Sequence, residues 1–91
     1  MDDKLREIQT GFHVCLEDSG KDLGAVRRVA PGGRDELIVY IQNEGNFIVP
    51  ARAVRPGEGA KVLLDRSQLE PRVRDAIARA EQRADSTDSA G

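Results

Sequence analysis

The chain has 91 residues, with 14 Lys and Arg against 16 Asp and Glu, which gives a formal net charge of −2 at pH 7. A chain this short builds one hydrophobic core, so it forms a single domain with little stability to spare for a large, strained catalytic cavity. Its charge balance provides no long-range positive field for a phosphate backbone, which disfavours general nucleic-acid binding and leaves only a local basic patch open.

Cysteine usage and hydropathy bear on the location of the protein. Cys15 is the only cysteine, so no intramolecular disulfide can form, and residues 1–10 lack the charged and then apolar pattern of a signal peptide. The longest apolar run, Leu37 to Ile41, is far shorter than the roughly 20 residues of a membrane helix. We therefore expect a cytoplasmic protein without a membrane span.

The first third of the chain predicts a mobile segment followed by a hairpin. Residues 1–10 are mostly charged or polar and are expected to bury little. Apolar residues then alternate with others, as in a half-buried strand, at Phe12, Val14 and Leu16. Asp18 to Lys21 contains turn-forming residues, so Leu23 to Val29 should return as the second arm, with Gly24 marking a bulge or a sharp bend.

The middle of the chain predicts further strands. Glu36 to Ile41 is the strongest β segment, and both of its faces are apolar, so we expect the C-terminal helix or a second subunit to shield one face. After a turn at Asn43 to Gly45, Asn46 to Pro50 should pair with it as the next arm, and Ala60 to Asp65 is the last predicted strand. Strands of this length and spacing predict a closed or nearly closed barrel.

A helix is predicted after the strands. Ser67 and Glu70 fit a capping box, and Pro71 falls in the first turn, where its missing N–H does no harm. One apolar stripe follows on a helical projection, formed by Leu69, Val73, Ile77, Ala80 and Ala84. The residues expected in water on the opposite face are Arg74, Glu81 and Asp85.

The resulting fold is mainly β, a small closed or partly open antiparallel β-barrel of five to six strands with one C-terminal α-helix. The barrel is expected over residues 11–66, after the mobile segment 1–10. The helix, residues 67–84, packs on the barrel or on a partner, and residues 85–91 form a disordered tail because they contain no apolar anchor.

Two motifs in this order resemble the PRC-barrel family. One is a D-x-G-K-x-x-G-x-V hairpin, Asp18 to Val26, and the other is a Phe-x-Val-Pro arm, Phe47 to Pro50, followed by Val54. The resemblance covers Phe12 to about Leu64. That family takes its name from the photosynthetic reaction-centre H subunit and also supplies the C-terminal domain of ribosome-maturation factors. It implies a small barrel that docks onto other macromolecules, and it brings no catalytic residues.

The departures from the family pattern are Cys15, the Pro-Gly-Gly insertion at Pro31 and the lack of the partner domain that many members carry.

Three short patterns resemble metal, nucleophile or phosphate sites but lack residues that such sites need. His13 and Cys15 point to one face of a strand, yet a structural zinc site needs four ligands and no other His or Cys exists. As a nucleophile pair they lack a third, orienting group. The Gly57 to Lys61 segment lacks the full spacing of a phosphate loop, and Asp18 with Asp22 lacks the oxygen ladder of a calcium loop. We predict no metal, no cofactor and no catalytic residue.

Arginines form the one candidate basic patch. Arg72, Arg79 and Arg83 lie along the border of the helix stripe, and Arg27 with Arg28 adds charge on the second strand. An ordinary solvated helix flank, partly neutralised by Asp75 four residues before Arg79, explains these side chains better than RNA contact does. Only three aromatic residues are present, so no stacking platform for bases is visible.

The leading functional hypothesis is a non-enzymatic module for protein–protein interaction, by docking or by formation of a homodimer. Its candidate contact residues are Ile38, Tyr40, Val73 and Ile77. The alternative is an RNA- or ribosome-associated factor that uses Arg72, Arg79 and Arg83.

Overall fold

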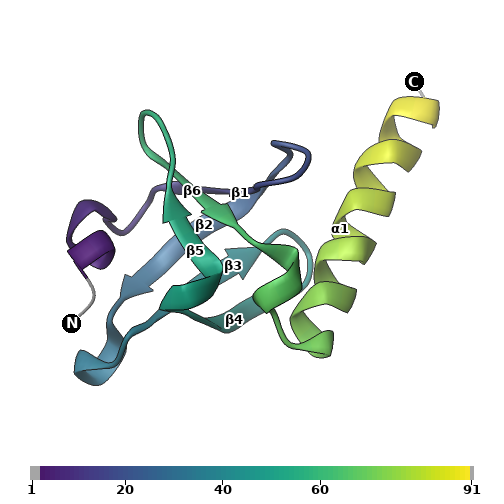
Figure 1. The fold of residues 1–91 in the computed structure, drawn as a ribbon. Coiled ribbons are helices and arrows are strands. Elements are labelled where there is room, and N and C mark those ends of the chain that lie inside the picture. Colours follow the sequence, from purple (N-terminus) through teal and green to yellow (C-terminus); the bar gives the residue numbers. More distant parts are fainter. Residues whose placement is uncertain (1–2, 91) are drawn as a thin grey trace.

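A computed structural model describes the backbone of residues 3–90 and the side chains of residues 5–82. The described strands are β1 (His13–Leu16), β2 (Asp22–Val29), β3 (Glu36–Ile41), β4 (Gly45–Pro50), β5 (Val54–Pro56) and β6 (Lys61–Leu64). The long helix is α1 (Pro71–Ala90), and the short 3-10 helices are η1 (Asp3–Glu7), η2 (Pro31–Gly33), η3 (Ala51–Ala53) and η4 (Arg66–Gln68) (Figure 1).

The strands form one curled sheet in the order β4-β3-β2-β1-β6-β5. This confirms the mainly β prediction, a partly open small barrel with one C-terminal helix. The pairing is not antiparallel throughout, because β1 and β6 run parallel, with Val14 beside Val62. Short hairpins force neighbouring strands to be antiparallel, whereas residues 17–60 separate β1 from β6 and leave their direction free.

Strand β5 is not among the strands predicted from the sequence, because it is only three residues long and ends at Pro56. It is an edge strand of the sheet. Proline is tolerated at such an edge because the missing N–H breaks no hydrogen bond of the ladder.

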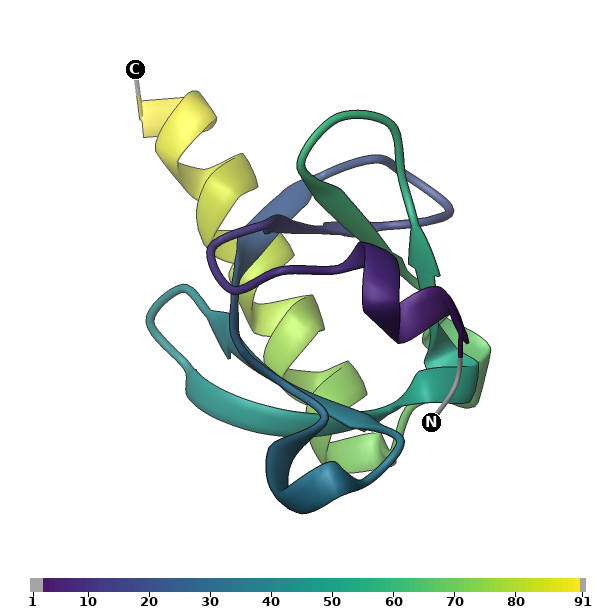
Figure 2. The same ribbon diagram turned by 90° about the vertical axis from the view of Figure 1, so that its left-hand side faces the viewer.

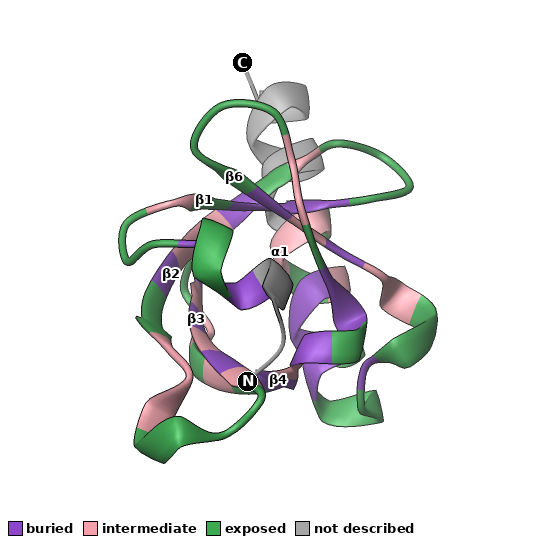
Figure 3. Ribbon diagram, turned by 60° about the vertical axis from the view of Figure 1, so that its left-hand side comes forward, coloured by how far each residue is buried: buried purple, intermediate pink, exposed green. Residues whose placement is uncertain are grey.

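The core lies inside the curl of the sheet and beneath α1. Leu37, Val39 and Ile41 of β3 point inward and are fully buried. From the helix, Val73 is 3% exposed and Ile77 is 0% exposed in the same hydrophobic cluster. The described part of the apolar stripe, from Leu69 to Ala80, is therefore covered by the sheet of its own chain (Figure 3).

The N-terminal segment corrects an expectation. Residues 1–10 were expected to bury little, but Leu5 is 1% exposed and Ile8 is 3% exposed, and both belong to the core. Figures 1 and 2 place η1 and α1 at opposite ends of the curled sheet. An open barrel exposes its interior at both ends, so two apolar side chains suffice to draw this short segment onto one of them.

The start of the helix also differs from the prediction. The N–H and hydroxyl of Ser67 donate to the Asp65 carboxylate, at 3.0 and 2.7 Å, so Ser67 belongs to η4 and does not cap α1. These bonds lower the pKa of Asp65. Helix α1 begins at Pro71, and the Glu70 carbonyl accepts from the N–H of Val73. The predicted disorder of residues 85–91 lies outside the part of the chain whose side chains are described.

Gly24 allows β2 and β3 to approach each other closely. A Cβ at this position would collide with the carbonyl oxygen of Tyr40 on β3, and the β1–β2 register shifts immediately beside it. The bulge that the glycine predicted is confirmed, and the absent side chain lets β2 pass close to β3 while the sheet curls.

Leu5→Ala should destabilise the protein by about 2–5 kcal/mol, because the side chain is fully buried and its loss leaves a cavity. Urea unfolding followed by circular dichroism measures the change. Gln9→Ala, an exposed change in the same segment, is the control and should have little effect. Equal midpoints for the two variants would mean that the N-terminal segment does not belong to the core.

Candidate functional site

The outer face of β3 and β4 carries an apolar surface that the helix does not cover. Ile38 and Tyr40 of β3 alternate with the buried residues and are half-buried. Ile48 of β4 lies directly opposite Ile38 in the register and is 52% exposed, the one exposed large hydrophobic residue among residues 5–82. Side chains opposite each other on one face of a sheet pack together, so these three form a continuous surface.

Two arginines of β2 border this surface. The register between β2 and β3 shifts between Val26 and Arg28, and the extra residue leaves Arg27 and Arg28 both exposed. The Arg27 guanidinium lies over the Tyr40 ring, with Cζ 4.9 Å from the ring centroid, and Arg28 is opposite Ile38. We name the set Ile38, Tyr40, Ile48, Arg27 and Arg28 the outer patch.

A groove of about 510 Å³ runs beside β4. Asn46, Phe47 and Ile48 all line it, although their side chains alternate between the two faces of the sheet, so the groove must follow the edge of the strand. The residues lining the groove, here named the β4 groove, are Glu36, Asn46, Phe47, Ile48, Pro50, Arg52, Gln68, Glu70, Arg72 and Val73. Arg72 lies over the Phe47 ring at 5.9 Å and so connects the helix wall to the strand wall.

Strand β4 is the last in the sheet order, so one of its edges has no neighbouring strand. The Ala51 N–H donates to the Asp35 carbonyl oxygen at 2.8 Å. This bond shows which residues of β4 form hydrogen bonds with β3. Antiparallel ladders alternate, so the N–H and C=O of Asn46 and Ile48 point away from β3 toward the groove.

The structure separates the four residues predicted to contact a partner. Ile38 and Tyr40 lie on the outer patch, whereas Val73 and Ile77 are buried beneath the sheet of the same chain. Sequence reasoning missed Ile48, whose neighbours Phe47 and Val49 are also apolar. The pairing of Ile48 with Ile38 was the available signal, because a strand aligned on Val49 as a core residue turns Ile48 outward.

Arg72 and Arg79, two of the three arginines predicted for RNA contact, have different partners. Arg79 donates to Glu44 in the β3–β4 turn at 2.8 Å, so Glu44, rather than the expected Asp75, is the carboxylate that pairs with it. Arg72 lies on the β4 groove. The side chain of Arg83 lies outside the described residues.

His13 and Cys15 differ in exposure. His13 Nδ1 is 3.0 Å from Asp22 Oδ2, and both side chains are more than half exposed. Cys15 is 3% exposed, and burial raises the pKa of its thiol. Across residues 5–82, His, Cys, Asp and Glu nowhere come together in the threes that a metal ion would need. A buried thiol of raised pKa is a poor nucleophile.

Arg66 joins three elements of the fold. Its Nε donates to Asp18 Oδ2 at 3.2 Å in the β1–β2 turn, and its Nη2 donates to Glu81 Oε1 at 3.2 Å on α1. Glu81, expected in water, is only 20% exposed because it faces this guanidinium. A surface hollow of about 490 Å³ adjoins Arg66, but its Nε and Nη2 groups already donate to Asp18 and Glu81, which gives this side chain a structural role.

The described part of α1 and the shorter helices contain no stretch long and apolar enough to cross a membrane. Comparisons with protein-family models, with curated proteins and with solved structures found no match to this chain. The PRC-barrel resemblance therefore stays a prediction from the two motifs.

Cys15 should react with iodoacetamide at least about 10-fold more slowly in the native protein than in the chain unfolded by guanidinium chloride, because the thiol is buried and its pKa is raised. Mass spectrometry of timed samples measures the rate. A native rate equal to the unfolded rate would place the thiol at the surface.

Arg66 and Glu81 should show a coupling energy of about 0.5–1 kcal/mol in a double-mutant cycle of Arg66→Met and Glu81→Gln. The value stays small because the Arg66 side chain is 37% exposed and solvent screens the pair. Urea unfolding of the four proteins measures it, and high salt should reduce it. Additive effects of the two changes would show that the pair contributes nothing.

Proposed function

We propose that this chain is a non-enzymatic, PRC-barrel-like module that binds another protein through the outer patch. The observation that carries the proposal is the 52% exposed Ile48 beside the half-buried Ile38 and Tyr40, on the one sheet face that neither η1 nor α1 covers. A contiguous apolar surface on a small domain typically marks an interaction site.

The residue types support a protein partner. Tyr and Arg are enriched among the residues that contribute most to binding energy, and here the Arg27 guanidinium stacks on the Tyr40 ring. An apolar centre with a charged border is the usual anatomy of an interface. The three apolar residues alone are too few for a standard interface of about 800 Å² on each partner, so the contact must extend beyond them.

The charge of the border indicates the partner. Arg27 and Arg28 are exposed and lie on the same side of the apolar centre. A partner surface with an apolar centre and carboxylates at its border complements them, and such complementarity speeds association and fixes orientation. A cytoplasmic location fits a chain whose lone cysteine is a free, buried thiol.

RNA binding through Arg72, Arg79 and Arg83 is the weaker proposal. Arg79 already pairs with Glu44, and Arg72 lies over Phe47, so neither guanidinium is aimed at a common phosphate track. An enzymatic function has less support still, because the Cys15 thiol is buried and its pKa is raised, which makes it a poor nucleophile.

Ile48→Glu and Tyr40→Glu should abolish partner binding without unfolding the barrel, because each puts a carboxylate into the apolar centre. Proteins captured by the immobilised chain from a cell extract are quantified by mass spectrometry. Thr10→Glu, which adds the same charge at an exposed site of the N-terminal segment, is the control. A partner retained by wild type and control, and lost by about 10-fold or more with both patch variants, would support the proposal.

Sedimentation over a concentration series separates the two kinds of protein partner. A dimer that dissociates with Ile48→Glu identifies the partner as a second copy, and a monomer identifies it as a different chain. Equal capture by all four proteins, together with an unchanged mass, would refute the proposed role of the outer patch.

A further inference from the structure

We propose that the partner supplies an extended segment that lies in the β4 groove and adds to the free edge of β4 as a further β-strand, with at least one acidic side chain directed at Arg52 and Arg72. The inference rests on the proposed function and names the form and chemistry of the partner. It is carried by the unpaired edge, the shape of the groove and the charges of its lining.

The backbone of β4 defines what can bind along it. Asn46 and Ile48 each direct one N–H and one C=O toward the groove, so donors and acceptors repeat at roughly 6.8 Å, the distance of two residues in a strand. An extended polypeptide complements such a row, and strand addition to exposed sheet edges is a common mode of peptide recognition. Pro50 offers only its carbonyl, so the added ladder ends there.

The groove is shaped for one strand. One wall is β4, and the other is formed by residues 68–73 of η4 and the start of α1. The volume of about 510 Å³ lies within the roughly 300–1,000 Å³ of known ligand pockets. The helix wall occupies the space into which the sheet of a second copy would extend. The groove therefore favours a single extended segment over the β4 edge of a second copy.

The two faces of the added strand would meet different surroundings. Residues on its outer side continue the outer patch beside Ile48, where an apolar side chain fits. Residues on its inner side face Phe47 and the helix wall, where Arg72 lies over the aromatic ring. The segment should therefore alternate apolar and acidic positions.

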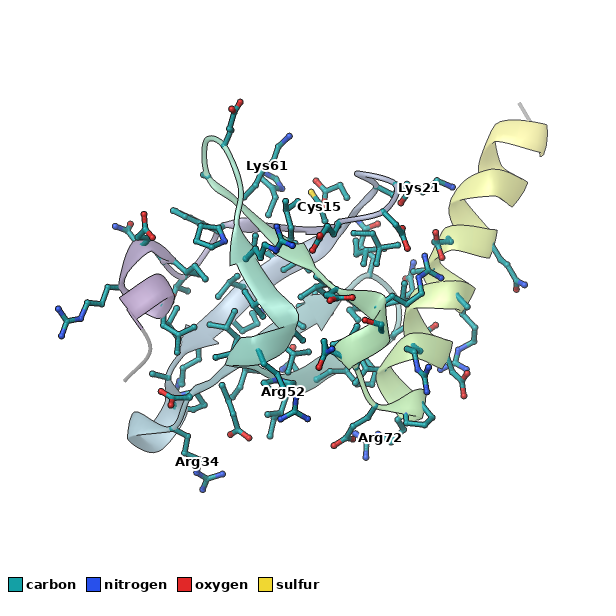
Figure 4. The ribbon with its side chains drawn as sticks, viewed as in Figure 1. Cys15, Lys21, Arg34, Arg52, Lys61 and Arg72 are labelled. Atoms are coloured by element: carbon teal, nitrogen blue, oxygen red, sulfur yellow. The ribbon has the colours of Figure 1, made fainter. Side chains whose placement is uncertain are left out.

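The charges of the lining favour an acidic segment. Neither Arg52 nor Arg72 has an ion pair with any residue whose side chain is described. Of the two carboxylates in the groove, Glu36 is compensated by Arg34 at 3.8 Å, which leaves Glu70 against two guanidiniums. Figure 4 shows Arg52 and Arg72 on the same, lower side of the molecule. Carboxylates of a partner would form charge-assisted hydrogen bonds with these two guanidiniums.

Glu36 adds an unsatisfied acceptor beside the same strand. Its Oε1 atom is buried and accepts no hydrogen bond from the residues whose side chains are described. Glu36 is opposite Pro50 in the register, so this oxygen lies near the end of β4 that has no N–H to offer. An N–H of the added segment would supply the missing donor, and buried polar atoms usually have one.

The probe is a display library of random twelve-residue linear peptides, selected on the full-length protein. We expect the selected peptides to alternate apolar residues with Asp or Glu. Binding of the best synthetic peptide should weaken by about 10-fold or more with Arg52→Glu combined with Arg72→Glu, and much less with both changed to Lys. A library without any binder, or binders without acidic residues, would overturn the inference.

Amide hydrogen exchange of the complex tests strand addition directly. The amides of Asn46 and Ile48 should become protected when the peptide binds, whereas those of Phe47 and Val49, already bonded to β3, should change little. N-methylation along the peptide should abolish binding at alternate positions only. Uniform sensitivity to N-methylation, or no new protection at the two edge amides, would show binding without strand addition.

Ile48→Pro and Ile48→Val form a matched pair on the protein side. Proline removes the outward N–H and leaves the ladder to β3 intact, whereas valine keeps the N–H, so only proline should weaken peptide binding. If Ile48→Pro unfolds, the peptide N-methylation series still decides. Loss of partner capture with Ile48→Glu, combined with equal peptide binding by the pair, would retain the proposed function and reject strand addition.

Discussion

The fold depends on closing the two open ends of a half-barrel. Six short strands curl into a sheet whose interior is lined by aliphatic side chains, and a sheet that does not close leaves that interior open to water. Helix α1 closes one end with Val73, Ala76 and Ile77, and η1 closes the other with Leu5. Because hydrophobic burial is the main stabilising term of a small domain, both covers are part of the core.

Neither α1 nor η1 covers the outer face of β3 and β4. The helix takes the inward side of β3, so Ile38 and Tyr40 on the other side stay half-buried and meet the exposed Ile48. The two edges of the sheet are also unequal. Strand β5 is three residues long, ends at Pro56 and contacts η1, whereas β4 is six residues long and borders a groove. Short or covered edges resist further pairing, and β4 has neither protection.

The arginines form two groups. Some fasten α1 to the turns of the sheet, and others lie on the outer patch and the β4 groove. Arg66 fastens the β1–β2 turn to α1 through Asp18 and Glu81, and Arg79 fastens the helix to the β3–β4 turn through Glu44. Arg27 and Arg28 of the outer patch and Arg52 and Arg72 of the groove make no such ties with the described residues. The two sets of arginines look alike in the sequence, because composition records the charge of a side chain and not its partner.

The sequence by itself determined the fold class, the long strands and the bulge at Gly24, because period-two alternation and turn chemistry act over a few residues. It did not determine how η1 and α1 close the two open ends of the half-barrel. That η1 belongs to the core, that β1 and β6 run parallel and that Ile48 is exposed at a free edge all depend on contacts between distant segments. Such contacts form only when the whole sheet has curled, so tertiary structure alone decided which apolar residues remained at the surface for a partner.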